Sequence, residues 1–243
     1  WDALFKICRV YAKDPLDAWD QHIQNLKLRS QYLNEKAYRR LHYHAPGTDL
    51  TIGLPEGHRW KSAGFSTRGG IPFTESIPMK EVFTLPHRRR LEGTVSSTRP
   101  LAYAGNVIDQ FSLTFEKGRV VQFSARQGEQ ILSDLLRIDE GACMLGEVAL
   151  VPNSSPISRS DLLFYNTLLD ENASCHLALG AAYGFSLQGG EQMAEEEFVS
   201  RGGNISLIHE DFMIGSGELD VDGELADGSR EAVLRSGEWA FPL

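Results

Sequence analysis

A histidine and an aspartate lie two positions apart near the C-terminal end of the chain, in "SLIHEDFMIG" (206–215). Side chains two apart on a β-strand point to the same face, so His209 and Asp211 would stand side by side if this stretch is extended. Most of their neighbours are apolar, and a charge in apolar surroundings is costly unless it is paired or ligated. The pair therefore predicts either an internal ion pair or part of a metal site.

Three other stretches place ionisable groups in similarly apolar company. Glu81 precedes a short apolar run in "IPMKEVFTLP", Glu147 is the only charge in "CMLGEVALVP", and "DENASCHLALGAAYG" contains His176 and Tyr183. For any one of them, a hydrogen bond or an ion pair is the commoner explanation. Together with the first pair they supply three carboxylates and two imidazoles, more than a catalytic mononuclear zinc site uses. Such a set suits two divalent ions with one bridging carboxylate.

Two further groups of ionisable residues have simpler explanations. His42 and His44 share the two-residue spacing, but they follow two arginines and have no carboxylate nearby, so we expect a surface or supporting role. The basic run "HRRR" could meet a carboxylate or a phosphate, but for Arg89 and Arg90 we expect a solvated loop. His87 and Arg88 follow Glu81 closely and are secondary candidates for lining the site.

Other classes of site are poorly supported. "DVDGELADGSRE" starts like a calcium loop, but Leu225 stands where such a loop needs glycine, so a hairpin turn is favoured. The chain has no G-x-S-x-G serine motif and neither of the common glycine-rich nucleotide-binding motifs. The net charge of -9, from 33 acidic and 24 basic residues, argues against nucleic acid or an anionic membrane as a partner.

The cysteines and the hydropathy pattern indicate a cytoplasmic protein. Cys8, Cys143 and Cys175 are odd in number, widely spaced and without a C-x-x-C pair, which favours neither a disulfide framework nor a thiolate zinc site. A reducing compartment fits this pattern best. The sequence contains no run of about 18 apolar residues, the length that a membrane-spanning helix needs.

The chain divides into a helical entry segment and a strand-rich region. Residues 1–44 are rich in helix formers, and Asp14 before a proline is a possible helix N-cap. The region 45–243, which carries the candidate ligands, has short apolar runs separated by Gly, Pro and Ser. Hairpins are predicted at 111–125 and 217–234, and helices at 127–138 and 160–169, the latter capped by Ser160. We therefore expect an α+β fold with a largely antiparallel or mixed sheet, flanking helices, and the metal site at strand and helix ends.

Four blocks of the sequence resemble the M29 family of metalloaminopeptidases. They are "EVFTLPHRRRLEGTVSSTRPL", "DEGACMLGEVALVPNSSPIS", "LFYNTLLDENASCHLALGAAY" and "GGNISLIHEDFMIGS". The resemblance extends over essentially the whole chain and implies that an N-terminal α/β domain of the family is absent here, in agreement with the abrupt start at Trp1. One departure is Glu210, where an apolar or small residue is expected; on a strand it would point away from the ligands.

The resemblance implies a cytoplasmic aminopeptidase that removes the N-terminal residue from peptides with a free N-terminus. Its metal ligands would be Glu81, Glu147, His176, His209 and Asp211, and they would hold two ions of zinc, cobalt or manganese. Tyr183 matches the active-site tyrosine, Glu147 is the best candidate for the bridging carboxylate, and Glu81 and Glu147 are both candidates for accepting the proton. A homodimer is also implied. The alternatives are a non-catalytic metal-binding domain and a dinuclear hydrolase with a non-peptide substrate.

Overall fold

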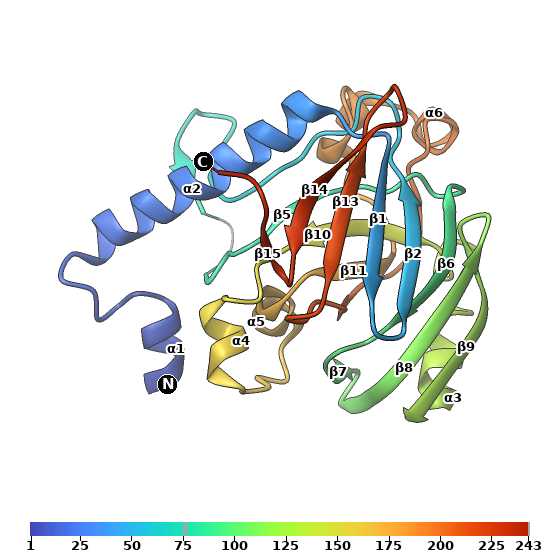
Figure 1. The fold of residues 1–243 in the computed structure, drawn as a ribbon, viewed down its shortest axis with the longest axis horizontal. Helices are drawn as coiled ribbons and strands as arrows, with labels where there is room; N and C mark the ends of the chain where they lie inside the picture. Colours follow the sequence, from blue (N-terminus) through green and yellow to red (C-terminus); the bar gives the residue numbers. More distant parts are fainter. Residues whose placement is uncertain (75–76, 243) are drawn as a thin grey trace.

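Two antiparallel sheets pack face to face in the computed structural model, which describes residues 1–74 and 77–242. In Figure 1 the large sheet lies in front and the strands of the smaller sheet cross behind it. All the strand pairings are antiparallel, as expected for an α+β fold. This arrangement gives the smaller sheet one covered face and one face that is free to carry a site.

The large sheet follows the order β15-β14-β13-β1-β2-β6-β8-β7, with β9 paired to β8. Its strands are β1 (Arg40–Ala45), β2 (Thr48–Gly53), β6 (Leu91–Ser96), β7 (Leu101–Tyr103), β8 (Asn106–Glu116), β9 (Arg119–Gln127), β13 (Asp220–Glu224), β14 (Arg230–Arg235) and β15 (Glu238–Trp239). Both predicted hairpins are confirmed, as β8–β9 around Lys117-Gly118 and as β13–β14 around Asp227-Gly228. The stretch that starts like a calcium loop is therefore a hairpin.

The smaller sheet has the order β12-β11-β10-β5. Its strands are β5 (Val82–Thr84), β10 (Leu145–Leu150), β11 (His176–Gly180) and β12 (His209–Met213); a separate hairpin pairs β3 (Phe65–Ser66) with β4 (Pro72–Phe73). Every residue of β10 and β11 is buried. Because the residues on both faces of these strands are buried, the usual alternation of apolar and polar residues is replaced by alternation between core residues, which face the large sheet, and site residues on the other face.

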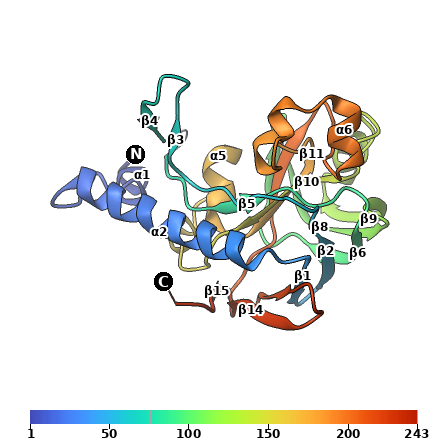
Figure 2. The ribbon, with the colours of Figure 1, turned by 90° about the horizontal axis from the view of Figure 1, so that it is seen from above.

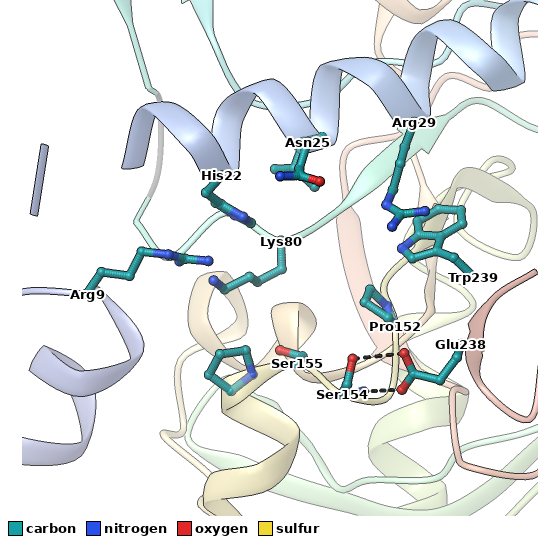
Figure 3. A pocket seen from close by; sticks show the side chains of 12 residues that line it. Arg9, His22, Asn25, Arg29, Lys80, Pro152, Ser154, Ser155, Glu238 and Trp239 are labelled. Atoms are coloured by element: carbon teal, nitrogen blue, oxygen red, sulfur yellow. Dashed lines mark hydrogen bonds between the residues drawn. The ribbon is translucent and has the colours of Figure 1, made fainter. Parts of the chain in front are cut away.

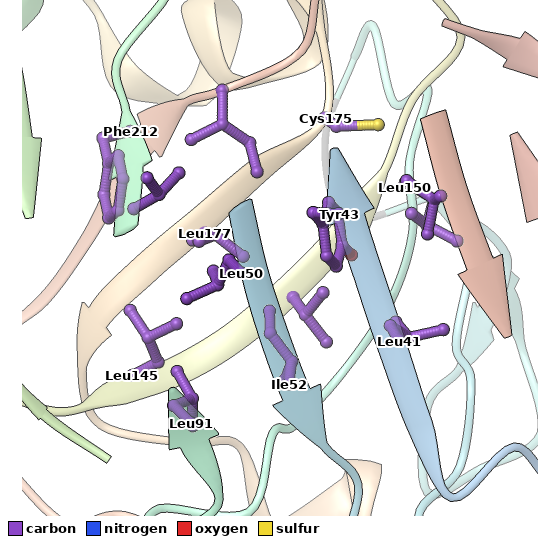
Figure 4. Close-up of a cluster of buried hydrophobic side chains, with 14 of the residues drawn as sticks. Leu41, Tyr43, Leu50, Ile52, Leu91, Leu145, Leu150, Cys175, Leu177 and Phe212 are labelled. Carbon is purple, nitrogen blue, oxygen red and sulfur yellow. The ribbon is translucent and has the colours of Figure 1, made fainter. Parts of the chain in front are cut away.

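The main core lies between the two sheets (Figure 4). Leu41, Leu50 and Ile52 of the large sheet face Leu177 and Phe212 of the smaller one, and all five side chains are almost fully buried. Burying a leucine-sized side chain stabilises the fold by about 1.5–3 kcal/mol. The sheet that carries the candidate ligands is thus anchored by its other face.

Helices lie at the edges of this sandwich. They are α1 (Asp2–Ile7), α2 (Pro15–Lys36), α3 (Glu129–Leu135), α4 (Pro156–Ser160), α5 (Thr167–Asp170) and α6 (Glu195–Ser200). Seen from above, α5 and α6 lie on the side of the smaller sheet that faces away from the large one (Figure 2). None of the helices in the described residues combines the length and apolar composition needed to cross a bilayer.

Two helix predictions need correction. The helical entry segment ends at Lys36, and residues 40–45 form strand β1, so the predicted boundary at residue 44 falls inside the large sheet. The Asp14 cap is confirmed, because its carboxylate accepts hydrogen bonds from the amides of Leu16 and Asp17, both at 3.1 Å.

The predicted helix at 160–169 is wrong except for its last residues. Ser160 ends α4 instead of capping a new helix, and Asp161 and Tyr165 both have positive φ angles, which interrupt a helix. The carboxylate of Asp170 accepts hydrogen bonds from the amides of Phe164 (2.8 Å) and Asn166 (3.1 Å). This side-chain bonding stabilises a loop that leads into the short helix α5.

Candidate metal centre

The five residues singled out in the sequence come together on the free face of the smaller sheet. Glu81 immediately precedes β5, Glu147 lies in β10, His176 begins β11, and His209 and Asp211 lie in β12. The four strands are neighbours in the sheet, so residues from four distant parts of the sequence converge on one surface. They form two groups of possible metal ligands, and Glu147 belongs to both.

Small residues of β11 leave room between these side chains. Ala178 is paired with Glu147 on one side and with Asp211 on the other, so the two carboxylates flank a methyl group. Gly180 is paired with His209 and has φ +103°; a Cβ there would lie 2.1 Å from the carbonyl oxygen of Ile208. Glycine at this position allows the chain entering β12 to come close enough to bring His209 over the site.

Glu147 faces a different imidazole with each of its oxygens. Its Oε1 is 3.6 Å from Nε2 of His176, and its Oε2 is 3.9 Å from Nε2 of His209. On the first side, Nε2 of His176 is also 2.8 Å from Oε2 of Glu81; on the second, Nε2 of His209 is 3.6 Å from Oδ1 of Asp211. One carboxylate thus joins two pairs, each made of an imidazole and a second carboxylate.

Backbone carbonyls orient both imidazoles. Nδ1 of His176 is 3.1 Å from the carbonyl oxygen of Ser174, and Nδ1 of His209 is 2.7 Å from that of Ala181. A carbonyl only accepts hydrogen bonds, so in each neutral ring the proton is placed on Nδ1 and the lone pair on Nε2. Both Nε2 atoms point at the carboxylates, and this is the arrangement in which histidine ligates metal ions.

The site holds more negative charge than its own protein atoms balance. Oε2 of Glu81, Nε2 of His176 and Oδ1 of Asp211 are buried without a hydrogen-bond partner among the described residues. Although Glu81 and His176 approach to 2.8 Å, these two atoms do not meet in hydrogen-bond geometry. Buried polar atoms nearly always have a hydrogen-bond partner, so these three unpartnered atoms are suited to act as ligands of a bound cation.

Three ionisable groups of the site have raised pKa values. Burial, together with the carboxylates of Glu81 and Asp211, raises the pKa of Glu147 to about 7 against the opposing effect of His176. Burial alone would lower the pKa of His176, but the carboxylates of Glu147 and Glu81 outweigh it and raise that pKa well above its ordinary value. The pKa of His209 is raised in the same way, as Asp211 and Glu147 outweigh burial.

A cavity of about 590 Å³ is lined by four of the five candidate ligands, Glu81, Glu147, His209 and Asp211. Tyr183 lines it, with its ring 4.5 Å from that of His209 and stacked on Phe185 at 5.1 Å. Burial and the surrounding carboxylates raise the pKa of Tyr183, so its hydroxyl keeps its proton at neutral pH. Much of the remaining wall is apolar and comes from Phe65, Phe73, Met79, Phe83, Leu168 and Phe185.

Sequence reasoning missed Glu171, which also lines the cavity. It is 7% exposed, and burial together with the carboxylates of Glu81 and Asp211 raises its pKa to about 10. Its place in "DENASCH", five residues before His176, was a usable signal, but nothing in that stretch predicts the short 3-10 helix Glu171–Ala173 that buries it.

Glu210 is paired with Leu179 and so lies on the face of β12 opposite to His209 and Asp211, as expected, but it is not remote from the site. It is half-buried and lines the same cavity, although it belongs to neither group of possible ligands. The reason is that β12 is the edge strand of its sheet, and α5 lies against it, so the cavity extends around the free edge. Burial and the neighbouring Asp211 carboxylate raise the pKa of Glu210 to about 7.

The secondary candidates His87 and Arg88 lie elsewhere. His87 lines a different cavity, and the buried guanidinium of Arg88 lies 3.3 and 3.4 Å from the sulfur of Met144. Arg89 and Arg90 are exposed, as predicted.

The other histidine pair also lies outside the cavity. His44 is exposed, and His42 in the large sheet has Nε2 2.8 Å from Oε2 of Glu224 and Nδ1 3.0 Å from the hydroxyl of Thr51. The same two-residue spacing that brings His209 and Asp211 into the site therefore places His42 and His44 outside it.

Comparison with known proteins identifies relatives along the whole chain. The model of the family described as thermophilic metalloprotease (M29) matches residues 1–239. Aminopeptidase AmpS of Bacillus subtilis (strain 168) is 54% identical over 241 residues, and aminopeptidase 2 of Geobacillus stearothermophilus is 51% identical over 243 residues. These alignments cover 99% and 100% of this chain and 59% of each relative.

Solved structures share the fold. Wild-type AmpT from Thermus thermophilus superimposes with a TM-score of 0.92 at 45% identity, over 99% of this chain and 58% of that one. A 2,5-dihydroxypyridine dioxygenase from Pseudomonas putida KT2440 has a TM-score of 0.59 at 16% identity, over 91% of this chain and 60% of that one, and this likeness concerns the fold alone.

The chain spans about 59% of the length of the curated relatives that it matches. Within that span, the family match and the identity to AmpS confirm the resemblance carried by the four sequence blocks. This chain belongs to the M29 family of metalloproteases.

Proposed function

We propose that this chain is the metal-carrying part of an aminopeptidase that removes the N-terminal residue from peptides with the help of two divalent ions. The observation that carries the proposal is Glu147, whose two oxygens face two different imidazole–carboxylate pairs. The relatives named aminopeptidases support the choice of substrate. Because the chain spans only part of their length, the activity is proposed for the complete protein.

In this proposal the ligands divide into two sets. Glu81 and His176 would hold one ion together with Oε1 of Glu147, and His209 and Asp211 would hold the other together with Oε2. Carboxylate and imidazole ligands accept zinc, cobalt and manganese, which are the metals that we propose. Ions bound there supply Lewis acidity at the scissile carbonyl and activate water for attack.

The chain's own residues have separate tasks around that centre. The protonated hydroxyl of Tyr183, which lines the cavity, would donate a hydrogen bond to the oxygen that gains charge during attack. Glu81 or Glu147 would accept a proton from the attacking water. The carboxyl groups of Glu171 and Glu210 line the same cavity and would offer hydrogen-bond acceptors to the free amino group of a substrate, and the apolar wall would take its side chain.

Two further features follow from the family and from the cysteines. We propose a homodimer, on the basis of the family resemblance, and a cytoplasmic location, because all three cysteines are free thiols. A monomer by light scattering of the complete protein would contradict the first of these.

The function is tested by replacing Glu147 in the complete protein. Glu147→Gln should lower the turnover of leucine anilide by about a thousandfold or more, because metal ions typically supply several kcal/mol of transition-state stabilisation. Elemental analysis should give up to two divalent ions per wild-type chain and fewer in the variant. N-acetyl-leucine anilide should not be hydrolysed by either protein.

Glu224→Gln is a matched control, because Glu224 also lies beside a histidine but in the large sheet, away from the cavity. It should retain wild-type turnover and metal content. Full activity after thorough chelation, or equal cleavage of the acetylated substrate, would refute the proposal; metal binding without turnover of any peptide substrate would favour the non-catalytic alternative.

Removing the hydroxyl of Tyr183 tests its role in stabilising charge. Tyr183→Phe should lower kcat by about a hundredfold, the usual effect of losing one oxyanion donor, while the metal content stays unchanged. Tyr165→Phe, which removes a hydroxyl from an exposed tyrosine outside the cavity, is the control and should have no effect. An unchanged kcat in Tyr183→Phe would remove this residue from the mechanism.

The ion-free protein should lose stability as the pH rises from about 5 to about 8. The folded-state pKa values of Glu147 and Glu171, about 7 and about 10, lie above the ordinary value of 4.5. The folded protein therefore holds protons that the unfolded chain releases, and each such proton costs about 1.4 kcal/mol of stability per pH unit of increase. His176 and His209, whose pKa values are also raised, act in the same direction above 6.5.

Calorimetric melting temperatures with and without a chelator will check this. Added divalent ions should raise the melting temperature more at pH 8 than at pH 5, because ions replace the protons. Glu171→Gln should flatten the pH dependence of the chelated protein. A chelated protein that is more stable at pH 8 than at pH 5 would contradict the charge balance described for the site.

A further inference from the structure

A second cavity, of about 340 Å³, lies between α2, α4 and β15, outside the metal centre (Figure 3). Three cationic side chains line it: Arg9 from the turn after α1, Arg29 from α2, and Lys80 from the loop before β5. Its lining also includes one carboxylate, Glu238, and one imidazole, His22. The positive charges therefore outnumber the negative one.

Lys80 is the central feature of this cavity. Its side chain is buried, with 4% of the residue exposed, and its Nζ has no hydrogen-bond partner among the described residues. Figure 3 shows it extending into the space between α2 and the Ser155 region. Burial and the nearby positive charge of Arg9 lower the pKa of Lys80 to about 7, because its ammonium form is unfavourable in these surroundings unless a counterion or another acceptor is bound.

The two arginines increase the positive charge. Nη1 of Arg9 and Nη1 of Arg29 are each buried without a hydrogen-bond partner among residues 1–74 and 77–242. In Figure 3, Arg9 and Lys80 extend toward one another, so like charges share one end of the cavity. The guanidinium of Arg29 lies over the ring of Trp239, 4.7 Å from its centroid, which fixes its direction.

Neither Glu238 nor His22 supplies the missing acceptor. Both oxygens of Glu238 accept hydrogen bonds from Ser154, at 2.7 Å from its amide and 2.8 Å from its hydroxyl (Figure 3). His22 has Nε2 2.6 Å from the carbonyl oxygen of Met79. Burial and the positive charge of Lys80 lower the pKa of His22 to about 3, so the ring is neutral and adds no charge of its own.

We propose that this cavity binds a small oxyanion, a carboxylate or phosphate group, between Lys80, Arg9 and Arg29. Guanidinium and ammonium groups are the donors that proteins use for such ligands, and their charge-assisted hydrogen bonds are strong. The volume lies in the range of small-molecule sites. The ligand gives the unpartnered nitrogen atoms their acceptor.

The fully buried side chain and backbone of Asn172 make hydrogen bonds to residues of both cavities, this one and the 590 Å³ cavity at the metal centre. Its Oδ1 accepts a hydrogen bond from the amide of Lys80 (2.6 Å), and its carbonyl accepts one from the hydroxyl of Ser155 (2.7 Å). Its Nδ2 is 3.4 Å from Oε1 of Glu171. Replacements here can disturb the metal centre, so direct binding, and not turnover, is the proper measurement.

The experiment is calorimetric titration of the complete, chelated protein with inorganic phosphate and, separately, with succinate. Chelation prevents phosphate from binding through a metal ion. We expect saturable binding of one anion per chain. Lys80→Met should weaken it by about tenfold or more, the loss expected for one charge-assisted hydrogen bond. Lys13→Met removes the same charge from an exposed lysine outside the cavity and should leave the affinity unchanged.

Arg9→Gln provides a second test, since Arg9 is only half-buried and its replacement does not depend on how the fold tolerates a change at Lys80. It should weaken binding of the same anion. Preference for phosphate or for succinate identifies the group that is recognised, and either result supports the site. Absence of saturable binding of both anions, or equal affinity in wild type and Arg9→Gln, would overturn the proposal.

Discussion

The carboxylate of Glu147 imposes the constraint on which the rest of the structure depends. It is almost fully buried, it faces the imidazoles of His176 and His209, and further carboxylates lie on either side of it. Without cations this cluster must hold protons, as the raised pKa of Glu147 indicates. A protein that was selected for stability alone would have little reason to bury these charges together, because apolar residues of similar size are often equally stable or more so.

The two-sheet architecture makes such a site possible. One face of the smaller sheet packs on the large sheet through residues such as Leu177 and Phe212, and the other face presents the ligands. Alternation along β11 assigns Leu177 to the core and His176 and Ala178 to the site. Rigid neighbouring strands hold these side chains more precisely than loops would, and this favours a preorganised centre. The second cavity differs in this respect, because it lies where helices and loops meet at the edge of the sandwich.

Much of this could be predicted from local sequence. Isolated charges in apolar strands, such as Glu147, led to the cluster, and Lys117-Gly118 and Asp227-Gly228 marked the hairpins through their turn chemistry. The features that the sequence did not predict are those that tertiary contacts determine. The loop stabilised by Asp170 replaces a helix that the local pattern favours, Glu171 is brought to the cavity by a short 3-10 helix, and Glu210 reaches the cavity because its strand lies at an edge. Sequence spacing contains no information on which strand is an edge.

The central claim is that two ions share Glu147. Anomalous diffraction from crystals of the complete protein grown with cobalt tests it most directly. We expect two peaks about 3.5–4 Å apart, each within coordination distance of a different oxygen of Glu147. A single peak, or two peaks of which only one contacts Glu147, would contradict the account.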